Sequence, residues 1–131
     1  MRVQVLEKDV QRVILDWVNT LPGVKVWRRN VGAFRSEYKG KKRFIRFGQR
    51  GQADLEGIGP GGIHIEIETK RPKHSETTFE QTVWIQDLEQ RGAIAFFASN
   101  LDQCVEKMRI HYRRKGLAWD WRWEPEIRGS L

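Results

Sequence analysis

The sequence predicts a single α/β domain with a mixed β-sheet flanked by helices. Three observations lead to this class. Segments with the hydrophobic spacing of helices alternate with strand-like segments, which is typical of a sheet covered by helices. The chain of 131 residues is long enough to bury one hydrophobic core. It contains no internal repeat or low-complexity linker, so we expect one domain over residues 1–131.

The N-terminal part predicts one helix followed by one strand. Apolar residues recur at the spacing of a helix face over about residues 4–19. Leu21-Pro22-Gly23 should end this helix, because proline and glycine both interrupt helices. Residues 24–29 then alternate as a strand does. The expected buried stripe of the helix consists of Leu6, Val10, Val13, Ile14, Trp17 and Val18.

Two hairpins are expected next. Residues 31–50 should form an exposed hairpin or an ordered loop, with Lys39-Gly40-Lys41 at its turn. Residues 53–58 and 63–69 have the length and composition of strands. Gly59-Pro60-Gly61-Gly62 lies between them and suits a tight turn, so these two strands should pair with each other.

The C-terminal half adds a helix, a strand, a second helix and a tail. Thr78-Phe79-Glu80-Gln81 has the form of a capping box, which starts a helix over about residues 78–91. Residues 93–98 form an apolar run of strand length, and Ser99-Asn100 begins the last helix. The tryptophans after Leu117 alternate, which predicts a terminal strand or an apolar edge that packs on the core. The expected apolar stripes are Phe79, Val83, Trp84 and Leu88, then Leu101, Cys104, Val105, Met108 and Tyr112, and the alternating tryptophans are Trp119, Trp121 and Trp123.

Composition narrows the function classes. The single cysteine, Cys104, excludes an intramolecular disulfide and fits a reducing cytoplasm, and no Cys/His cluster has the spacing of a zinc site. We expect neither a signal peptide nor a membrane span, because the longest purely apolar run is only Ala93 to Ala98. The net charge of +7 favours a polyanionic partner such as nucleic acid or an anionic membrane surface.

The positive charge is concentrated in one segment. Between Lys25 and Arg50 there are ten basic residues and one acid, Glu37, so this segment carries +9 and the rest of the chain −2. Aromatic residues interleave with these cations, a mixture that suits phosphate contacts with some stacking. A solubilising surface is the alternative explanation. The ten cations are Lys25, Arg28, Arg29, Arg35, Lys39, Lys41, Lys42, Arg43, Arg46 and Arg50.

Acidic residues gather on the strand over residues 63–70. Strand side chains alternate, so His64, Glu66, Glu68 and Lys70 should share one face, opposite an apolar face. A solvated strand face is the simpler explanation for an isolated E-x-K triplet. Asp54, however, begins the partner strand and should lie across the sheet from Glu68 or Glu66. Carboxylates clustered in this way suit a hard divalent cation such as Mg²⁺, which also relieves their mutual repulsion.

These residues carry a family resemblance. The ordered set Gly51-Gln52-Ala53-Asp54-Leu55, Glu68-Thr69-Lys70 and Gln81 resembles the PD-(D/E)xK nuclease superfamily, and more closely its virus-type replication and repair nuclease (VRR-NUC) branch. The leading proline of the family is absent, since Ala53 precedes Asp54.

The similarity extends toward the N-terminus. Trp27-Arg28-Arg29-Asn30-Val31-Gly32 is similar to the segment before the active site of that branch, and Glu7 with Gln11 is similar to its N-terminal helix motif. The resemblance covers about residues 5–105 and implies a restriction-endonuclease-like fold, with a core over about residues 5–112. The Trp-rich tail over residues 113–131 has no counterpart in it.

The resemblance implies a role for each motif residue. Asp54 and Glu68 would bind Mg²⁺, with Mn²⁺ as a substitute, and the backbone carbonyl of Thr69 would be a further ligand. Lys70 would orient or activate the attacking water and offset charge in the transition state. Glu7 and Gln81 would reach the site from the first and second helices. Glu66 and His64 share the strand face but lie outside the motif.

The function expected from these observations is a metal-dependent endonuclease that hydrolyses DNA. Contacts from the basic segment position a backbone rather than identify bases, so we expect cleavage selective for a junction, flap or nick. A non-catalytic nucleic-acid-binding module and a metal-assisted hydrolase of small phosphates are the alternatives. Analogy with standalone members of the branch indicates a phage or mobile-element DNA-repair protein and a homodimer. The expected DNA contacts are Arg28, Arg29, Arg35, Lys41, Lys42, Arg43 and Arg46.

Overall fold

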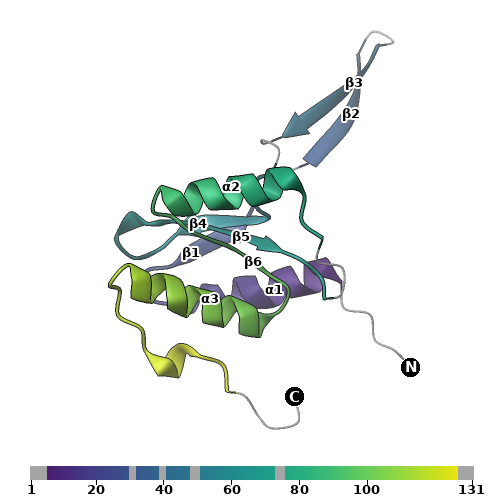
Figure 1. Cartoon of the computed structure of the whole chain (residues 1–131). Coiled ribbons are helices and arrows are strands. Elements are labelled where there is room, and N and C mark those ends of the chain that lie inside the picture. The colour runs from purple at the N-terminus through teal and green to yellow at the C-terminus, as the bar shows by residue number, and fades with distance from the viewer. Residues whose placement is uncertain (1–5, 30–31, 39–40, 48–50, 73–75, 127–131) are drawn as a thin grey trace, which may run out of the picture.

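A computed structural model describes residues 6–29, 32–38, 41–47, 51–72 and 76–126, with 32–38 and 41–47 described by their backbone alone. It confirms the expected α/β class, with a mixed sheet between helices (Figure 1). In chain order the elements are α1 (Glu7–Val18), β1 (Lys25–Arg28), β2 (Gly32–Tyr38), β3 (Lys41–Phe47), β4 (Leu55–Ile58), η1 (Pro60–Gly62), β5 (His64–Thr69), α2 (Phe79–Gln90), β6 (Ile94–Ala98), α3 (Leu101–Arg114) and η2 (Trp121–Trp123).

The main sheet has the strand order β1-β4-β5-β6. The β4 and β5 strands form the expected hairpin, with Leu55 opposite Ile67, and β1 pairs antiparallel with the other edge of β4. The turn between β4 and β5 contains Gly61 and Gly62 at φ 71° and 83°, values that favour glycine. The β6 strand pairs parallel with β5, because α2 carries the chain back across the sheet.

Helices cover both faces of this sheet. Figure 1 shows α2 on one face and α1 with α3 on the other. The larger core lies under α1 and α3, where Ile65 and Ile67 of β5 are completely buried against Ile14 and Met108. The smaller core lies under α2 and is built around Ile85. No helix in the described ranges combines the length and the apolar character needed to cross a membrane.

The apolar stripe predicted for α2 is confirmed at Leu88, which packs on the smaller core, and was wrong at Phe79 and Val83. The side chains of Phe79 and Val83 are 80% and 45% exposed, and Ile85 is the buried residue of the helix. The reason lies in the sheet below, where this face carries Glu66 together with small alanines. The helix therefore turns the Trp84 indole toward Glu66 instead of burying a continuous apolar stripe.

The Trp-rich tail packs on the core but does not form a strand. Trp119 and Trp123 make edge-to-face contacts with the ring of Tyr112, at centroid distances of 5.1 and 6.3 Å. The Trp17 indole also donates a 2.9 Å hydrogen bond to the Trp123 carbonyl. After Trp119, a short 3₁₀ turn leaves the side chain of Trp121 75% exposed. Alternation alone could not distinguish this turn from a strand.

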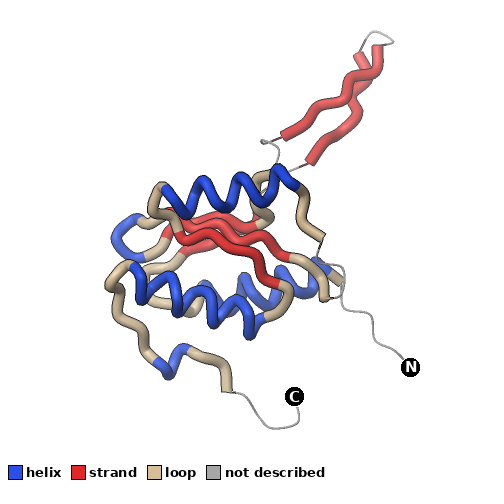
Figure 2. The backbone as a smooth tube through the Cα atoms, viewed as in Figure 1, coloured by secondary structure: helices blue, strands red, loops and turns tan. Residues whose placement is uncertain are grey.

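Two strands of the basic segment, β2 and β3, form a hairpin separate from the main sheet. Strands β2 and β3 pair antiparallel over their whole length, from Gly32 opposite Phe47 to Tyr38 opposite Lys41. Of the two expectations, hairpin or ordered loop, the hairpin is confirmed. Its expected turn residues Lys39 and Gly40 lie outside the described residues. Figure 2 shows the hairpin extending away from the main sheet, beyond one end of α2.

Candidate metal centre

Three acidic side chains from distant parts of the chain meet at one end of the main sheet. Asp54 immediately precedes β4, Glu68 lies near the end of β5, and Glu7 begins α1. One carboxylate oxygen from each lies within 4.8 Å of the other two. The β4–β5 register explains the pairing, since Leu55 opposite Ile67 brings the residue before Leu55 alongside Glu68.

Asp54 is held in place by Thr69. Oδ2 of Asp54 accepts hydrogen bonds from the Thr69 backbone N–H at 3.1 Å and from its hydroxyl at 2.8 Å. Thr69 is completely buried, so both donors are fixed by the strand. The structure thus gives Thr69 a role that the sequence did not predict, which is to orient Asp54. Its carbonyl as a metal ligand stays a prediction.

Glu68 is buried without a full set of partners. Its side chain is 2% exposed, and within the described residues Oε2 has no hydrogen-bond partner. Burial, then hydrogen bonding with Asp54 and the Asp54 charge, raise the pKa of Glu68 from 4.5 to about 9, against the opposing effect of Lys70. Burial and the neighbouring Asp54 likewise raise the pKa of Glu7. Burial and mutual repulsion thus disfavour the charged forms of these two acids.

Lys70 lies beside the acids and is tied to α2. Its ammonium donates a 2.8 Å hydrogen bond to Oε1 of Gln81. The same oxygen accepts from the Thr78 backbone N–H at 3.1 Å, as part of the expected capping box. Gln81 therefore both starts the helix and positions Lys70. Arg71 also lies close enough to lower the pKa of Glu7. The sequence analysis did not single out this residue, whose one distinguishing feature in the sequence is that it directly follows Lys70.

Glu66 faces the same side of β5 as Glu68, but several hydrogen-bond donors contact its carboxylate. Its Oε1 accepts from the Trp84 indole at 2.8 Å and lies 3.0 Å from the Arg29 guanidinium. Its Oε2 lies 2.6 Å from Nε2 of His64, and the Ala53 backbone N–H donates weakly at 3.4 Å. On the polar face of β5, Glu66 and Glu68 are therefore buried, while His64 is exposed and contacts Glu66.

Arg29 belongs to the scaffold of the site. Its side chain is 12% exposed, and its guanidinium also lies 2.6 Å from Oε2 of Glu56. Its Nε donates to the Ala53 carbonyl at 3.2 Å, while its backbone N–H donates to the Asp54 carbonyl at 2.8 Å. This geometry does not favour the DNA contact expected from the sequence. Arg29 instead fixes the backbone that carries Asp54.

The remaining predicted DNA contacts lie on β1 and on the hairpin. Arg28 is exposed at the end of β1. The others are placed by strand register alone, since their side chains lie outside the described part of the chain. The chain returns from the hairpin at Gly51, where a Cβ would lie 2.3 Å from the Glu80 carbonyl oxygen, next to Gln81. The register positions are Arg35 opposite Phe44, Lys41 opposite Tyr38, Lys42 opposite Glu37, Arg43 opposite Ser36 and Arg46 opposite Ala33.

No protein-family model matches the chain, and no curated protein matches it significantly.

The donor set at the centre fits a hard divalent ion. All three candidate ligands offer carboxylate oxygen, which Mg²⁺ and Mn²⁺ prefer over nitrogen or sulfur. The unpartnered Oε2 of Glu68 is a buried acceptor that a cation would satisfy. In the described ranges His64 is engaged by Glu66 and is not part of this group.

Proposed function

We propose that this chain is a divalent-metal-dependent nuclease that hydrolyses DNA phosphodiester bonds. The observation that carries the proposal is the buried Oε2 of Glu68, left without a partner beside two other carboxylates. Asp54 and Glu68 would hold Mg²⁺ or Mn²⁺, with Glu7 as a third carboxylate. Membership of the VRR-NUC branch, with its restriction-endonuclease-like fold, forms part of this proposal.

The chain's own residues supply the rest of the chemistry. A divalent ion bound here would lower the pKa of a bound water and polarise the scissile phosphate. Lys70 supplies a positive charge beside the carboxylates, and its hydrogen bond to Gln81 holds the ammonium in position. Thr69 and Arg29 hold Asp54 from two sides, so the carboxylate need not reorganise when substrate arrives.

The basic hairpin supports DNA as the substrate. It is inserted between Arg29, which contacts the Asp54 backbone, and Gly51, which packs on the first turn of α2. Both ends of the inserted segment therefore join the centre directly. The charge of +9 over residues 25–50 suits the phosphate backbone of a long polyanion better than a small phosphate ester. Structure-selective endonuclease action on a junction, flap or nick is the form that we propose.

The test is a titration of Mg²⁺ and Mn²⁺ with the full chain on single-stranded, duplex, nicked, flap and four-way-junction DNA. We expect cleavage that requires added metal and stops with a chelator, and the panel identifies the preferred structure. Lys70→Ala should abolish cleavage but keep DNA affinity, since one lysine contributes little to the total charge.

Two results would overturn the proposal. Full activity of rigorously metal-free protein would exclude the metal centre. Tight DNA binding without cleavage of any substrate, at any metal concentration, would favour the alternative of a non-catalytic binding module.

A further inference from the structure

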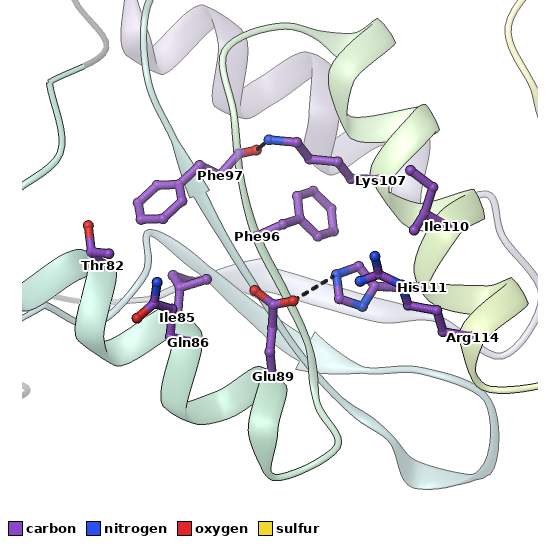
Figure 3. A pocket seen from close by; sticks show the side chains of 10 residues that line it. All are labelled: Thr82, Ile85, Gln86, Glu89, Phe96, Phe97, Lys107, Ile110, His111 and Arg114. Atoms are coloured by element: carbon purple, nitrogen blue, oxygen red, sulfur yellow. Dashed lines mark hydrogen bonds and ion pairs between the residues drawn. The ribbon is translucent and has the colours of Figure 1, made fainter.

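A second concave site lies between α2 and α3, over the edge strand β6, and shares no residue with the acidic centre. Figure 3 shows its side chains, with Phe96 and Phe97 on the strand between the two helices. The cavity has a volume of about 360 Å³, within the usual range for small-ligand sites. Its walls carry Glu89 from α2, and Lys107 and Arg114 from α3.

The groove has two chemically different ends. Thr82 to Glu89 on α2 and Lys107 to Arg114 on α3 each span seven residue steps, about 10 Å of helix. At one end Glu89 faces His111, with 3.7 Å between Oε2 and Nε2. At the other end the Lys107 ammonium donates a 2.5 Å hydrogen bond to the Phe97 carbonyl.

The Glu89 end is an acceptor site at neutral pH. Burial, and then the charges of Arg114 and Lys115, lower the pKa of His111 to about 4, so the ring is neutral there. The ring hydrogen-bonds the backbone of Ala95. A separation of 3.7 Å is too long for a hydrogen bond to Glu89. The carboxylate therefore faces the groove as an acceptor without a protonated partner in His111.

The aromatic floor of the groove favours a planar ligand, and the Lys107 end favours an anionic group on that ligand. Phe96 stacks with His111 at a centroid distance of 5.8 Å, and Phe97 is partly exposed beside it. Lys107 uses one N–H on the Phe97 carbonyl and keeps two others for an anion. A free metal cation is disfavoured, because Lys107 and Arg114 line this groove as positive charges.

We propose that this groove binds a guanine mononucleotide. The N1–H and the amino group of guanine are adjacent donors that the Glu89 carboxylate can accept together, while Arg114 can donate to O6. The purine plane would lie along the partly exposed Phe97, and the phosphate would reach Lys107 at the other end of the groove. This proposal uses no residue of the proposed nuclease site, so either proposal can be refuted without affecting the other.

Calorimetric titration of the full chain compares GMP, IMP, AMP, guanosine and inorganic phosphate. We expect GMP to bind at least about tenfold more tightly than IMP, which lacks the amino group, and than AMP, whose N1 is an acceptor. GMP should also bind more tightly than guanosine. Absence of GMP binding, equal affinity for GMP and IMP, or phosphate binding as tight as GMP binding would each overturn the proposal.

Matched variants locate the two ends. Glu89→Gln should weaken GMP binding about tenfold, whereas Glu106→Gln, an exposed glutamate of α3 outside the groove, should not. Lys107→Met should remove the preference for GMP over guanosine. Lys115→Met is its control, because Lys115 also caps a backbone carbonyl, that of Gly92, outside the groove. Circular dichroism confirms folding of each variant, and equal effects of a variant and its control would refute the assignment.

Discussion

Glu66 and Glu68 lie two positions apart on the same face of β5, and each side chain is 2% exposed. Donors surround Glu66, whereas Glu68 has a buried oxygen without a partner and a pKa raised to about 9. The same residue type on the same strand thus has two roles. Glu66 contacts Arg29, which holds the backbone at Asp54, and Glu68 is the residue that we propose as a metal ligand.

The first prediction concerns the pH dependence of stability in the metal-free protein. The pKa of Glu68 rises from 4.5 to about 9 on folding, so between these values the folded state binds more protons than the unfolded state. Stability should therefore fall as pH rises, by up to about 1.4 kcal/mol per pH unit from this group. Urea unfolding in the presence of a chelator, repeated at several pH values, measures how the free energy of unfolding changes with pH. Glu68→Gln should flatten the slope and leave stability at neutral pH unchanged or higher; an unchanged slope would contradict the assignment.

The second prediction concerns Glu66. Glu66→Gln removes the buried charge that balances Arg29, and should lower the free energy of unfolding by about 2 kcal/mol. The control is Glu80→Gln, an exposed glutamate of α2, which should change stability by less than about 0.5 kcal/mol. Equal stability of the two variants in urea unfolding would show that the Glu66 network is not stabilising.

The acids of the centre could be predicted from their order in the sequence, but their surroundings could not. Strand alternation placed Glu66 and Glu68 on one face, and the turn after β4 placed Asp54 near Glu68. Whether that face is solvated depends on α2, whose packing is a tertiary property. For the same reason the sequence did not predict that Glu66 and Glu56 lie against the Arg29 guanidinium, and a DNA contact of Arg29 stays a prediction.

At the scale of elements, the helix starts could be predicted wherever the capping residues are neighbours in the sequence. The capping box at Thr78 and Gln81 and the Asn100 cap of α3 start helices where expected. The buried face of α2 was partly mispredicted, because its partner surface contains Glu66, which attracts the Trp84 indole. Of the two alternatives for the tail, the strand was wrong because Asp120 caps a 3₁₀ turn, whereas the packing of Trp119 and Trp123 on the core is confirmed.

The third prediction belongs to the hairpin. Neutral substitution of Lys41, Lys42 and Arg43 together should weaken DNA binding and reduce the slope of log affinity against log salt by as much as roughly 3, at about 0.9 per lost phosphate contact on duplex DNA. Cleavage should recover at low salt. Arg113→Ala, an exposed cation of α3, should leave the slope unchanged. If the triple variant keeps the wild-type slope, the hairpin does not contact DNA.

At the scale of the whole molecule, the topology brings the parts of the centre together at one end of the sheet. The end of β5 carries Glu68, Thr69 and Lys70, while α1 contributes Glu7 and α2 contributes Gln81 from their first turns. The basic hairpin is inserted in the chain just before Asp54. The α/β class and the element order could be predicted from periodicity. The second groove could not, because two helices and an edge strand form it together.

The central claim is that Glu68 completes a site for a divalent cation, and direct metal binding tests it. Metal-free wild type and Glu68→Gln are titrated with Mn²⁺ side by side in a calorimeter, with Glu80→Gln as a control for charge. Wild type and the control should bind with similar affinity, and Glu68→Gln should bind at least about tenfold more weakly. Equal binding by all three proteins, or no binding by the wild type, would contradict the account.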